Sequence, residues 1–379
     1  MLLGVPKEIK SQEYRVGLTP AGVRELVGRG HQVLIQAQAG MAVGFSDELY
    51  RLAGAEIVED AAVIFARAEL IIKVKEPQEQ ECSLFRSGQV LFTYLHLAAA
   101  PKQAQLLLAA GVSGIAYETV TDAGGGLPLL LPMSEVAGRL AVQAGARFLE
   151  KSQGGLGILL GGVTGVAPAQ VVIIGGGVVG SQAARVAIGL GADVTLLDKS
   201  LPRLRQLSVE FGSSLRCVYA SSEAIEHYAL RANLVIGAVL IPGAAAPKVL
   251  SRELIQRMQK GTVVVDVAID QGGCFETSRP TTHEQPVYEV DGVIHYCVTN
   301  MPSGAARTAT EALTNATLPY ILAIADQGLS GAMLADEHLR RGLNLHAGHV
   351  TSSPVAAALG HPYCPAESLL AIGSDIAIR

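Results

Sequence analysis

Cysteine pairs, a signal sequence and blocks of one charge are all missing from this sequence of 379 residues. The five cysteines lie far apart and include no C-x-x-C pair, at positions Cys82, Cys217, Cys274, Cys297 and Cys364. This spacing indicates free, mostly buried thiols in a reducing compartment. The chain does not open with a charged segment followed by an apolar one, so we expect no secretory signal and a cytoplasmic location.

Two kinds of partner are disfavoured by the charge pattern. The net charge of −5 and the lack of a basic or aromatic-interleaved patch argue against nucleic acid. The mean hydropathy is positive, but the uncharged stretch of residues 152–184 is interrupted by many glycines and by Pro168. It cannot form the continuous apolar helix of ~20 residues that a membrane span requires, so we expect no membrane association.

We also predict no metal site and no thiol chemistry. The sequence has no H-E-x-x-H motif, and His346 and His349 fall in a predicted turn with glycine and asparagine, where we expect solvated side chains. Cys274 has no sequence neighbour that would activate its thiol, so we interpret it as a small packed residue.

The most informative motif is a glycine-rich loop between an apolar run and a helical stretch. Val171-Val-Ile-Ile precedes Gly175-Gly-Gly-Val-Val-Gly180, and Asp198 ends the next apolar run, 18 residues after the last glycine. This order of strand, tight turn, helix and acid predicts a site for the pyrophosphate and ribose of a dinucleotide.

Each residue of this motif has a predicted task. Gly175 permits the turn, Gly177 lets backbone amides approach the pyrophosphate, and Gly180 lets the helix lie close to the sheet. The phosphates would then meet the unpaired amides and the positive end of that helix. Asp198 would accept hydrogen bonds from the ribose and repel a 2′-phosphate, which favours NAD over NADP. Arg203 leaves NADP open, because an arginine can accommodate that phosphate; otherwise it is an ordinary solvated charge.

Short apolar runs alternate with helical patterns along most of the chain, which predicts an α/β protein of two domains. Before the glycine loop we expect strands at 2–5, 33–36, 70–74, 90–92 and 112–116. In the second half we expect six strands, beginning with the one that leads into the glycine loop, at 171–174, 194–197, 215–219, 234–237, 262–266 and 293–297. Six is the number of strands in a complete dinucleotide-binding sheet. Met133 to Lys151 reads as an amphipathic helix that crosses between the domains, with Ser134 as its N-cap.

The sequence therefore predicts two doubly wound α/β domains, joined by a long helix, with an active-site cleft between them. The segment from about Arg307 is rich in helical pattern and lacks a nucleotide motif. We expect it to return to the first domain, which gives a discontinuous substrate domain of residues 1–130 and 307–379. The Rossmann dinucleotide-binding domain would comprise residues 131–306.

Two long segments resemble the signature regions of the bacterial alanine dehydrogenases. The first is Gly4-Val-Pro-Lys-Glu-Ile-Lys10 with Glu13-Tyr-Arg-Val-Gly-Leu-Thr-Pro20, and the second runs from Asp266-Val-Ala-Ile-Asp270 to Arg279-Pro-Thr-Thr-His283. The similarity continues nearly end to end, through Asn300-Met-Pro302 and the segment 313–320. It implies reversible NAD-dependent oxidative deamination of L-alanine to pyruvate and ammonia, and a homohexamer.

The resemblance also implies roles for four residues, three of which lie near expected strand ends. Arg15 and Lys75 would hold the substrate carboxylate and carbonyl, for which a planar guanidinium and a movable ammonium are suited. His96 would be the general acid/base, because imidazole exchanges protons near neutral pH. Asp270 would orient the amine and the attacking water. Without the resemblance, the same residues would be interpreted as surface cations, a packed histidine and a turn aspartate.

Further positions match those that line the NAD site in the family. They are Ser134, Val178, Val179, Val239, Leu240, Val267, Ala268, Ile269, Asp270, Arg279, Val298, Thr299, Asn300 and Met301. Val239 and Leu240 are also explained as the apolar wall of the sheet. Around Ala220, where relatives tend to carry a serine, this chain has Ala-Ser-Ser, so that hydroxyl is shifted or absent.

Three other functions stay open at this point. The soluble NAD(H)-binding subunit of a proton-translocating transhydrogenase resembles the same family, but it typically lacks the histidine found here at His96. A dehydrogenase for saccharopine or a larger carboxyethyl amino acid would keep the cations and need a wider pocket. A non-catalytic NAD-binding protein would have no need of Lys75, His96 and Asp270.

Overall fold

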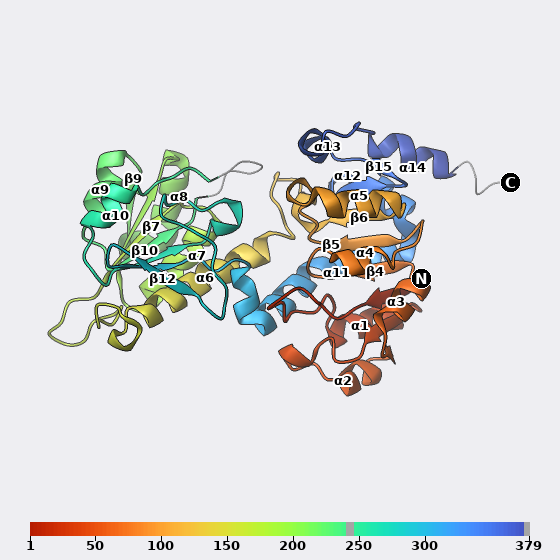
Figure 1. Cartoon of the computed structure of the whole chain (residues 1–379), viewed down its shortest axis with the longest axis horizontal. Coiled ribbons are helices and arrows are strands. Elements are labelled where there is room, and N and C mark those ends of the chain that lie inside the picture. The colour runs from red at the N-terminus through yellow and green to blue at the C-terminus, as the bar shows by residue number, and fades with distance from the viewer. Residues whose placement is uncertain (240–245, 375–379) are drawn as a thin grey trace. The chain divides into compact units, whose positions relative to one another are not determined.

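The computed structural model describes residues 1–239 and 246–374 of the chain. It divides into two compact units, which we call unit 1 (Met1–Met133 and Ala306–Arg379) and unit 2 (Ser134–Ala305). Figure 1 shows that the strands of each unit form a sheet flanked by helices. The predicted class of two doubly wound α/β domains is confirmed, since both sheets are mostly parallel.

Unit 1 holds an eight-stranded sheet in the order β15-β14-β6-β5-β4-β1-β2-β3. Its strands are β1 (Leu2–Val5), β2 (Gln32–Gln36), β3 (Glu56–Val58), β4 (Leu70–Ile72), β5 (Val90–Thr93), β6 (Ser113–Ala116), β14 (Leu343–His346) and β15 (His349–Val350). Strands β1 to β6 are parallel, and the hairpin β14–β15 continues the sheet in antiparallel pairing.

The helices of unit 1 connect and cover these strands. They are α1 (Pro20–Gly28), α2 (Asp47–Leu52), α3 (Ala61–Arg67), α4 (Glu79–Cys82), α5 (Pro101–Ala109), α11 (Ala306–Ala335), α12 (Glu337–Arg340), α13 (Ser353–Leu359) and α14 (Ala366–Ser374). Side-chain oxygens of Thr19, Ser46 and Asp60 each accept a backbone amide in the first turn of α1, α2 and α3, respectively. These N-caps satisfy backbone donors that a helix cannot pair internally, and they fix where each helix begins.

Unit 2 holds a seven-stranded sheet in the order β12-β13-β11-β10-β7-β8-β9. Its strands are β7 (Gln170–Ile174), β8 (Asp193–Asp198), β9 (Leu215–Tyr219), β10 (Leu234–Gly237), β11 (Val263–Asp266), β12 (Val287–Val290) and β13 (Val293–Tyr296). Its helices are α6 (Leu131–Phe148), which begins in unit 1, α7 (Val178–Gly189), α8 (Leu201–Phe211), α9 (Ser222–Ala229) and α10 (Arg252–Arg257). The six predicted strands are all present and parallel, in the order of a dinucleotide-binding sheet, with β12 as an antiparallel edge.

Both faces of the unit 2 sheet are buried. On β7, Val171 and Ile173 belong to one apolar cluster, whereas Val172 and Ile174 belong to a second cluster on the opposite face. A strand covered on both sides must be apolar at every position, which explains the unbroken hydrophobic run before the glycine loop.

Two predictions about the connecting helix are wrong. Helix α6 begins at Leu131 and ends at Phe148, rather than running from Met133 to Lys151. Ser134 is therefore the fourth helical residue and not the N-cap. Pro132 explains the earlier start, because proline is tolerated in the first turn of a helix, where its missing N–H would have no partner.

Four short strands were not predicted: β3, β12, β14 and β15. The pair His346 and His349, expected in a solvated turn, instead forms the last cross-strand pair of the β14–β15 hairpin. Ala347 and Gly348 make the turn with φ of 48° and 82°, the left-handed pair that a two-residue hairpin requires. His346 is half-buried and lies 2.8 Å from the Ser113 hydroxyl, and burial lowers its pKa.

One helical segment, Met301–Ala335, is long and apolar enough by length and composition to cross a membrane. Core helices of proteins without a membrane pass the same test, so the evidence for a span is weak. Leu313, Thr317, Ile321 and Ile324 of this helix are buried inside unit 1. The backbone is also non-helical at Gly328, where φ is 71°.

Helices α6 and α7 pack through a glycine. A Cβ added at Gly138 would lie 2.3 Å from the carbonyl oxygen of Val179, so the two backbones approach closely. We expect Gly138→Ala to destabilise unit 2 by about 1–3 kcal/mol, because the helices must separate to admit the methyl group. The urea midpoint of unfolding measures this.

Gly189→Ala is the matched control in α7, since its Cβ would meet no atom within 4 Å. Alanine there should increase the free energy of unfolding by about 0.5–1 kcal/mol, because alanine has a higher helix propensity than glycine. The urea midpoint should therefore rise slightly. Equal effects of the two substitutions would contradict the proposed packing constraint.

Candidate active site

The sheet of unit 1 brings the predicted substrate residues to one edge. The strand order reverses direction between β1 and β4, and ligands of doubly wound sheets bind beyond the carboxyl ends of the strands at such a point. Arg15 follows β1, Lys75 lies three residues after β4, and His96 lies three residues after β5. Each of three neighbouring strands, β1, β4 and β5, is thus followed in the chain by one of these predicted residues.

Arg15 is a buried cation rather than a surface one. Its side chain is 1% exposed and pairs in bidentate fashion with Glu13, with Nε–Oε1 and Nη2–Oε2 distances of 2.6 Å. Nη1 faces the Met133 sulfur at 2.9 Å. Burial disfavours the charge, but Glu13 outweighs this, and the pKa of Arg15 is raised. Glu13 thus occupies the Nε–Nη2 edge of the guanidinium and holds its charge and its plane in place.

Tyr94 lies between the other two predicted groups. The Lys75 ammonium is 5.9 Å from the centre of the Tyr94 ring, and the His96 imidazole stacks on the same ring at 5.9 Å with an interplanar angle of 4°. The hydroxyl of Tyr94 donates to the Leu129 carbonyl at 2.6 Å, which fixes the ring. Burial raises the pKa of Tyr94, and the charge of Arg15 opposes that shift. The structure therefore groups Arg15, Lys75 and His96 around one aromatic ring.

A buried ion triad supports the backbone of Lys75. Lys73 is fully buried, and its ammonium lies 3.0 Å from Glu8 and 2.8 Å from Glu81. The second oxygen of Glu8 accepts the amides of Val74 and Lys75 at 2.7 and 3.3 Å. Burial raises the pKa of Glu8 against the effect of Lys73, while the two carboxylates raise the pKa of Lys73 despite its burial. The triad holds the chain as it leaves β4.

In unit 2, the glycine loop has the predicted geometry. Gly175 has φ of 107°, and a Cβ there would lie 2.5 Å from the Ala238 carbonyl at the end of β10. A Cβ on Gly180 would lie 1.8 Å from the Gly175 carbonyl, so only glycine allows α7 to pack this closely. Gly177 is exposed at the N-cap of α7, and its Cβ direction is open, which leaves room for a phosphate at the helix N-terminus.

Asp198 and Arg203 both hold this loop. Asp198 accepts the Gly176 amide at 2.6 Å and the Ser200 amide at 2.7 Å. Arg203 donates from Nε to the Gly176 carbonyl at 2.6 Å. Arg203 is thus not merely a solvated charge, because it binds the carbonyl of the same glycine whose amide Asp198 accepts. A carboxylate at the end of the second strand remains suited to the ribose hydroxyls of a dinucleotide.

The loop after β11 is organised by one buried carboxylate. Asp266 is fully buried and accepts amides from Ala268, Cys274 and Phe275 at 3.1, 2.8 and 3.3 Å. The Ser278 hydroxyl donates to it at 2.5 Å, and the Cys274 thiol at 3.3 Å. Burial and Asp266 raise the pKa of Cys274, in agreement with its interpretation as a packed residue.

Asp270 projects from this organised loop and is exposed. It lies in a single helical turn, Ile269–Gln271, and accepts the Asn300 amide at 3.3 and 3.4 Å. Asn300 has φ of 53°, a left-handed backbone that asparagine adopts more readily than most residues with a Cβ. The structure therefore brings Asp270 and the segment 298–301 together.

Other predicted cofactor residues occupy varied settings. Arg279 stacks on the Tyr288 ring at 4.3 Å, and Val267 donates its amide to Gly237. Val298 and Met301 are buried, whereas Ser134, Val178, Val179 and Val239 are half-buried. Leu240 lies outside the described residues. Within the described ranges, no group of three His, Cys, Asp or Glu side chains could hold a metal ion.

All five cysteines lie in the described part of the chain and are free, with Cys82, Cys274 and Cys297 buried, as expected.

The geometry so far comprises a nucleotide-type loop in unit 2 and a cluster of cations with a histidine in unit 1. Sequence comparison assigns these features to a family. The profile described as "Alanine dehydrogenase/PNT, N-terminal domain" matches residues 4–137, and that of the corresponding "C-terminal domain" matches residues 141–353.

The chain belongs to the alanine dehydrogenase/PNT family. It is 58% identical to the alanine dehydrogenase of Halomonas elongata, across 98% of this chain and 100% of that protein. A solved L-alanine dehydrogenase is 52% identical with a TM-score of 0.93, covering 95% of this chain and 99% of that one. A solved transhydrogenase from Sinorhizobium meliloti is a more distant relative, at 25% identity and a TM-score of 0.80, covering 93% and 99%.

Several residues of this family member's site were not predicted from sequence. Glu13, Tyr94, Glu118 and Asp266 contact a predicted residue or the backbone next to it. Glu118 carries the same signal that identified Lys75 and His96, since it follows an apolar strand at the carboxyl edge of the sheet. Tyr94 had no such signal, because an aromatic residue in an apolar run is ordinarily part of the core.

Asp266→Asn tests whether one carboxylate organises the loop of residues 267–279. A carboxamide has one acceptor oxygen, and its NH₂ would face backbone donors, so we expect a loss of about 1.5–3 kcal/mol of local stability. The amides of Ala268, Cys274 and Phe275 should exchange faster in hydrogen–deuterium exchange mass spectrometry.

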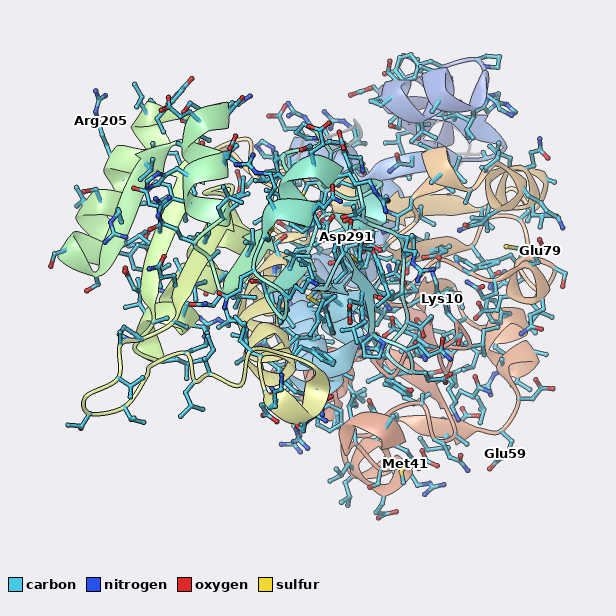
Figure 2. All side chains as sticks on the ribbon, turned by 60° about the vertical axis from the view of Figure 1, so that its left-hand side comes forward. Lys10, Met41, Glu59, Glu79, Arg205 and Asp291 are labelled. Atoms are coloured by element: carbon cyan, nitrogen blue, oxygen red, sulfur yellow. The ribbon has the colours of Figure 1, made fainter. Side chains whose placement is uncertain are left out.

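Asp291→Asn, at the exposed turn labelled in Figure 2, is the control for removal of an aspartate charge in the same unit. Asp291 has φ of 52°, which asparagine also adopts readily. Unchanged exchange of the 267–279 loop in Asp266→Asn would contradict the assignment.

Proposed function

We propose that this chain catalyses the reversible NAD-dependent oxidative deamination of L-alanine to pyruvate and ammonia. The grouping of Arg15, Lys75 and His96 around Tyr94 carries the proposal. It combines two cations suited to a carboxylate and a carbonyl with a group that exchanges protons near neutral pH. High identity to alanine dehydrogenases over nearly the full chain supports the same reaction.

Unit 2 has the features that NAD requires. The open N-terminus of α7 at Gly177 fits the pyrophosphate, and Asp198 fits the adenosine ribose while disfavouring a 2′-phosphate. The further cofactor contacts in this proposal are Ser134, Gly175, Val178, Val179, Gly180, Arg203, Val239, Leu240, Val267, Ala268, Ile269, Arg279, Val298, Thr299, Asn300 and Met301.

The chemistry follows from what each residue can hold or exchange. Bound NAD supplies the acceptor for the Cα hydrogen of alanine and its electron pair. Arg15 and Lys75 hold the substrate carboxylate and so fix the orientation of Cα. His96 takes a proton from the water that adds to the imine carbon, and Asp270 orients that water and the amine. Loss of ammonia then leaves pyruvate. The proposal draws its catalytic residues from both units, His96 from unit 1 and Asp270 from unit 2.

The remaining expectations are part of this proposal. We infer a cytoplasmic homohexamer that acts on small molecules without a nucleic-acid or membrane partner. The transhydrogenase reading is disfavoured because that relative is the more distant one and because His96 stands beside the two cations. Saccharopine-type substrates and a non-catalytic role are outcomes of the assay described next.

Oxidation of NADH by pyruvate plus ammonium tests the function directly. We expect rapid loss of NADH absorbance that depends on both compounds, with much slower turnover of glyoxylate, 2-oxoglutarate or NADPH. Preference for a larger oxo acid would move the assignment to a related dehydrogenase. Binding of NADH without turnover of any oxo acid would overturn the enzymatic proposal.

His96→Ala should lower kcat by the ~10² to 10⁴ typical of a lost acid/base group, with NADH affinity nearly unchanged. Steady-state kinetics and NADH fluorescence titration measure the two quantities. His349→Ala, an exposed histidine of β15, is the control and should keep wild-type kcat. A near-normal kcat in His96→Ala would remove this residue from the mechanism.

Asp198→Gly should relax the discrimination against NADPH, because the carboxylate that repels a 2′-phosphate is gone. NADH affinity should also fall, since Asp198 accepts the Gly176 amide of the phosphate loop. The ratio of kcat/KM for NADH and NADPH measures the discrimination. Asp193→Asn, at the opposite end of β8, removes a charge from the same strand and should leave the ratio unchanged. If Asp198→Gly also leaves it unchanged, other residues recognise the ribose.

A further inference from the structure

Glu118 lies directly beside the proposed acid/base and is engaged with its backbone. Its Oε1 accepts the His96 amide at 2.6 Å, and its two oxygens accept the Leu95 amide at 3.2 Å each. The same Oε1 lies 3.8 Å from Nδ1 of the His96 ring. We propose that Glu118 is a positioning residue that fixes the orientation of His96, an inference that rests on the proposed function.

The backbone of His96 explains why an acceptor is needed there. His96 has φ of 48° and ψ of 37°, a left-handed conformation that is strained for a residue with a Cβ. This turn directs two consecutive amides, those of Leu95 and His96, toward one carboxylate. A charged acceptor offsets the strain through charge-assisted hydrogen bonds, which are roughly twice as strong as neutral ones. Removing the charge releases the turn that aims the imidazole.

Glu118 is itself held firmly. It follows β6 in the single helical turn Tyr117–Thr119, and Tyr117 packs edge-on against Phe92 and Tyr94. The Tyr117 hydroxyl donates to the Lys73 carbonyl at 3.0 Å, and Asn344 donates to the Thr119 hydroxyl at 2.7 Å. The residues before and after Glu118 are thus both held by hydrogen bonds, and the Glu118 side chain is only 16% exposed.

The Glu118 carboxylate also faces the ring of His96. The 3.8 Å between Oε1 and Nδ1 exceeds a hydrogen bond, but it places the carboxylate on the Nδ1 side of the imidazole. The imidazole also stacks on Tyr94, over which the Lys75 ammonium lies. Because Nδ1 faces Glu118, Nε2 is the ring atom available to substrate and water.

The test compares Glu118→Gln with Glu118→Asp in the full-length protein. Glu118→Gln keeps the size and one acceptor oxygen but loses the charge. We expect kcat with pyruvate and ammonium to fall about ten- to a hundredfold through misplacement of His96, with KM for pyruvate and NADH affinity near wild type.

Glu118→Asp keeps the charge but shortens the reach to the two amides. Its kcat should fall less than that of Glu118→Gln, because a charged acceptor for the Leu95 and His96 amides remains. Glu79→Gln, an exposed carboxylate of α4 labelled in Figure 2 and paired only at the surface with Lys102, controls for loss of charge in unit 1. It should match wild type in every quantity.

Two results would overturn the inference. One is wild-type kcat in Glu118→Gln. The other is an equal loss of kcat in both variants together with a raised KM for pyruvate or weakened NADH binding, which would make Glu118 merely structural. If Glu118→Gln does not fold, Glu118→Asp decides alone, and wild-type kcat in that variant would contradict positioning. Failure of the proposed function is separate, because it would appear as absent pyruvate turnover in the wild-type chain.

Discussion

Backbone amides at the carboxyl ends of parallel strands need acceptors, and in this protein carboxylates supply them. Glu8 accepts amides after β4, Glu118 after β5, Asp198 after β7, and Asp266 after β11. Each of these strands leads into a segment that carries a proposed substrate or cofactor residue. A charged acceptor binds a backbone amide more strongly than a neutral one. The loops at the edge of each sheet are therefore fixed in conformation beyond the ends of the strands.

Burying so many carboxylates requires nearby cations, and this explains the charge pattern of unit 1. Lys73 balances Glu8 and Glu81, and Arg15 balances Glu13. Buried ion pairs contribute little net stability compared with apolar packing, but they are costly to break because one charge is then left alone. Their value here lies in geometry, since they hold Arg15 and the backbone of Lys75, the two cations of the proposed substrate site, in fixed positions. Stability and function therefore depend on the same contacts.

The strands of both sheets were largely predictable, because parallel strands buried on both faces leave long apolar runs such as residues 171–174. The glycine loop was predictable because only glycine fits at Gly175 and Gly180. Short edge elements such as β3 and β15 leave too little pattern to detect. The amide contacts of Glu118 and Asp266 were not predictable, since they join a side chain to backbone that only the folded chain brings near. Burial of Arg15 was hidden for the same reason, because its partner, Glu13, looks like any other charge.

The central claim is that the residues around Tyr94 and the glycine loop serve a single hydride transfer between an amino acid and NAD. The most direct measurement uses NADH that carries deuterium at both C4 positions, incubated with pyruvate, ammonium and oxidised NADP and followed by mass spectrometry of the products. The account predicts L-alanine with one deuterium on Cα, formed in step with loss of NADH. Deuterium passed to a second nicotinamide cofactor, with none in alanine, would contradict it and favour transhydrogenation.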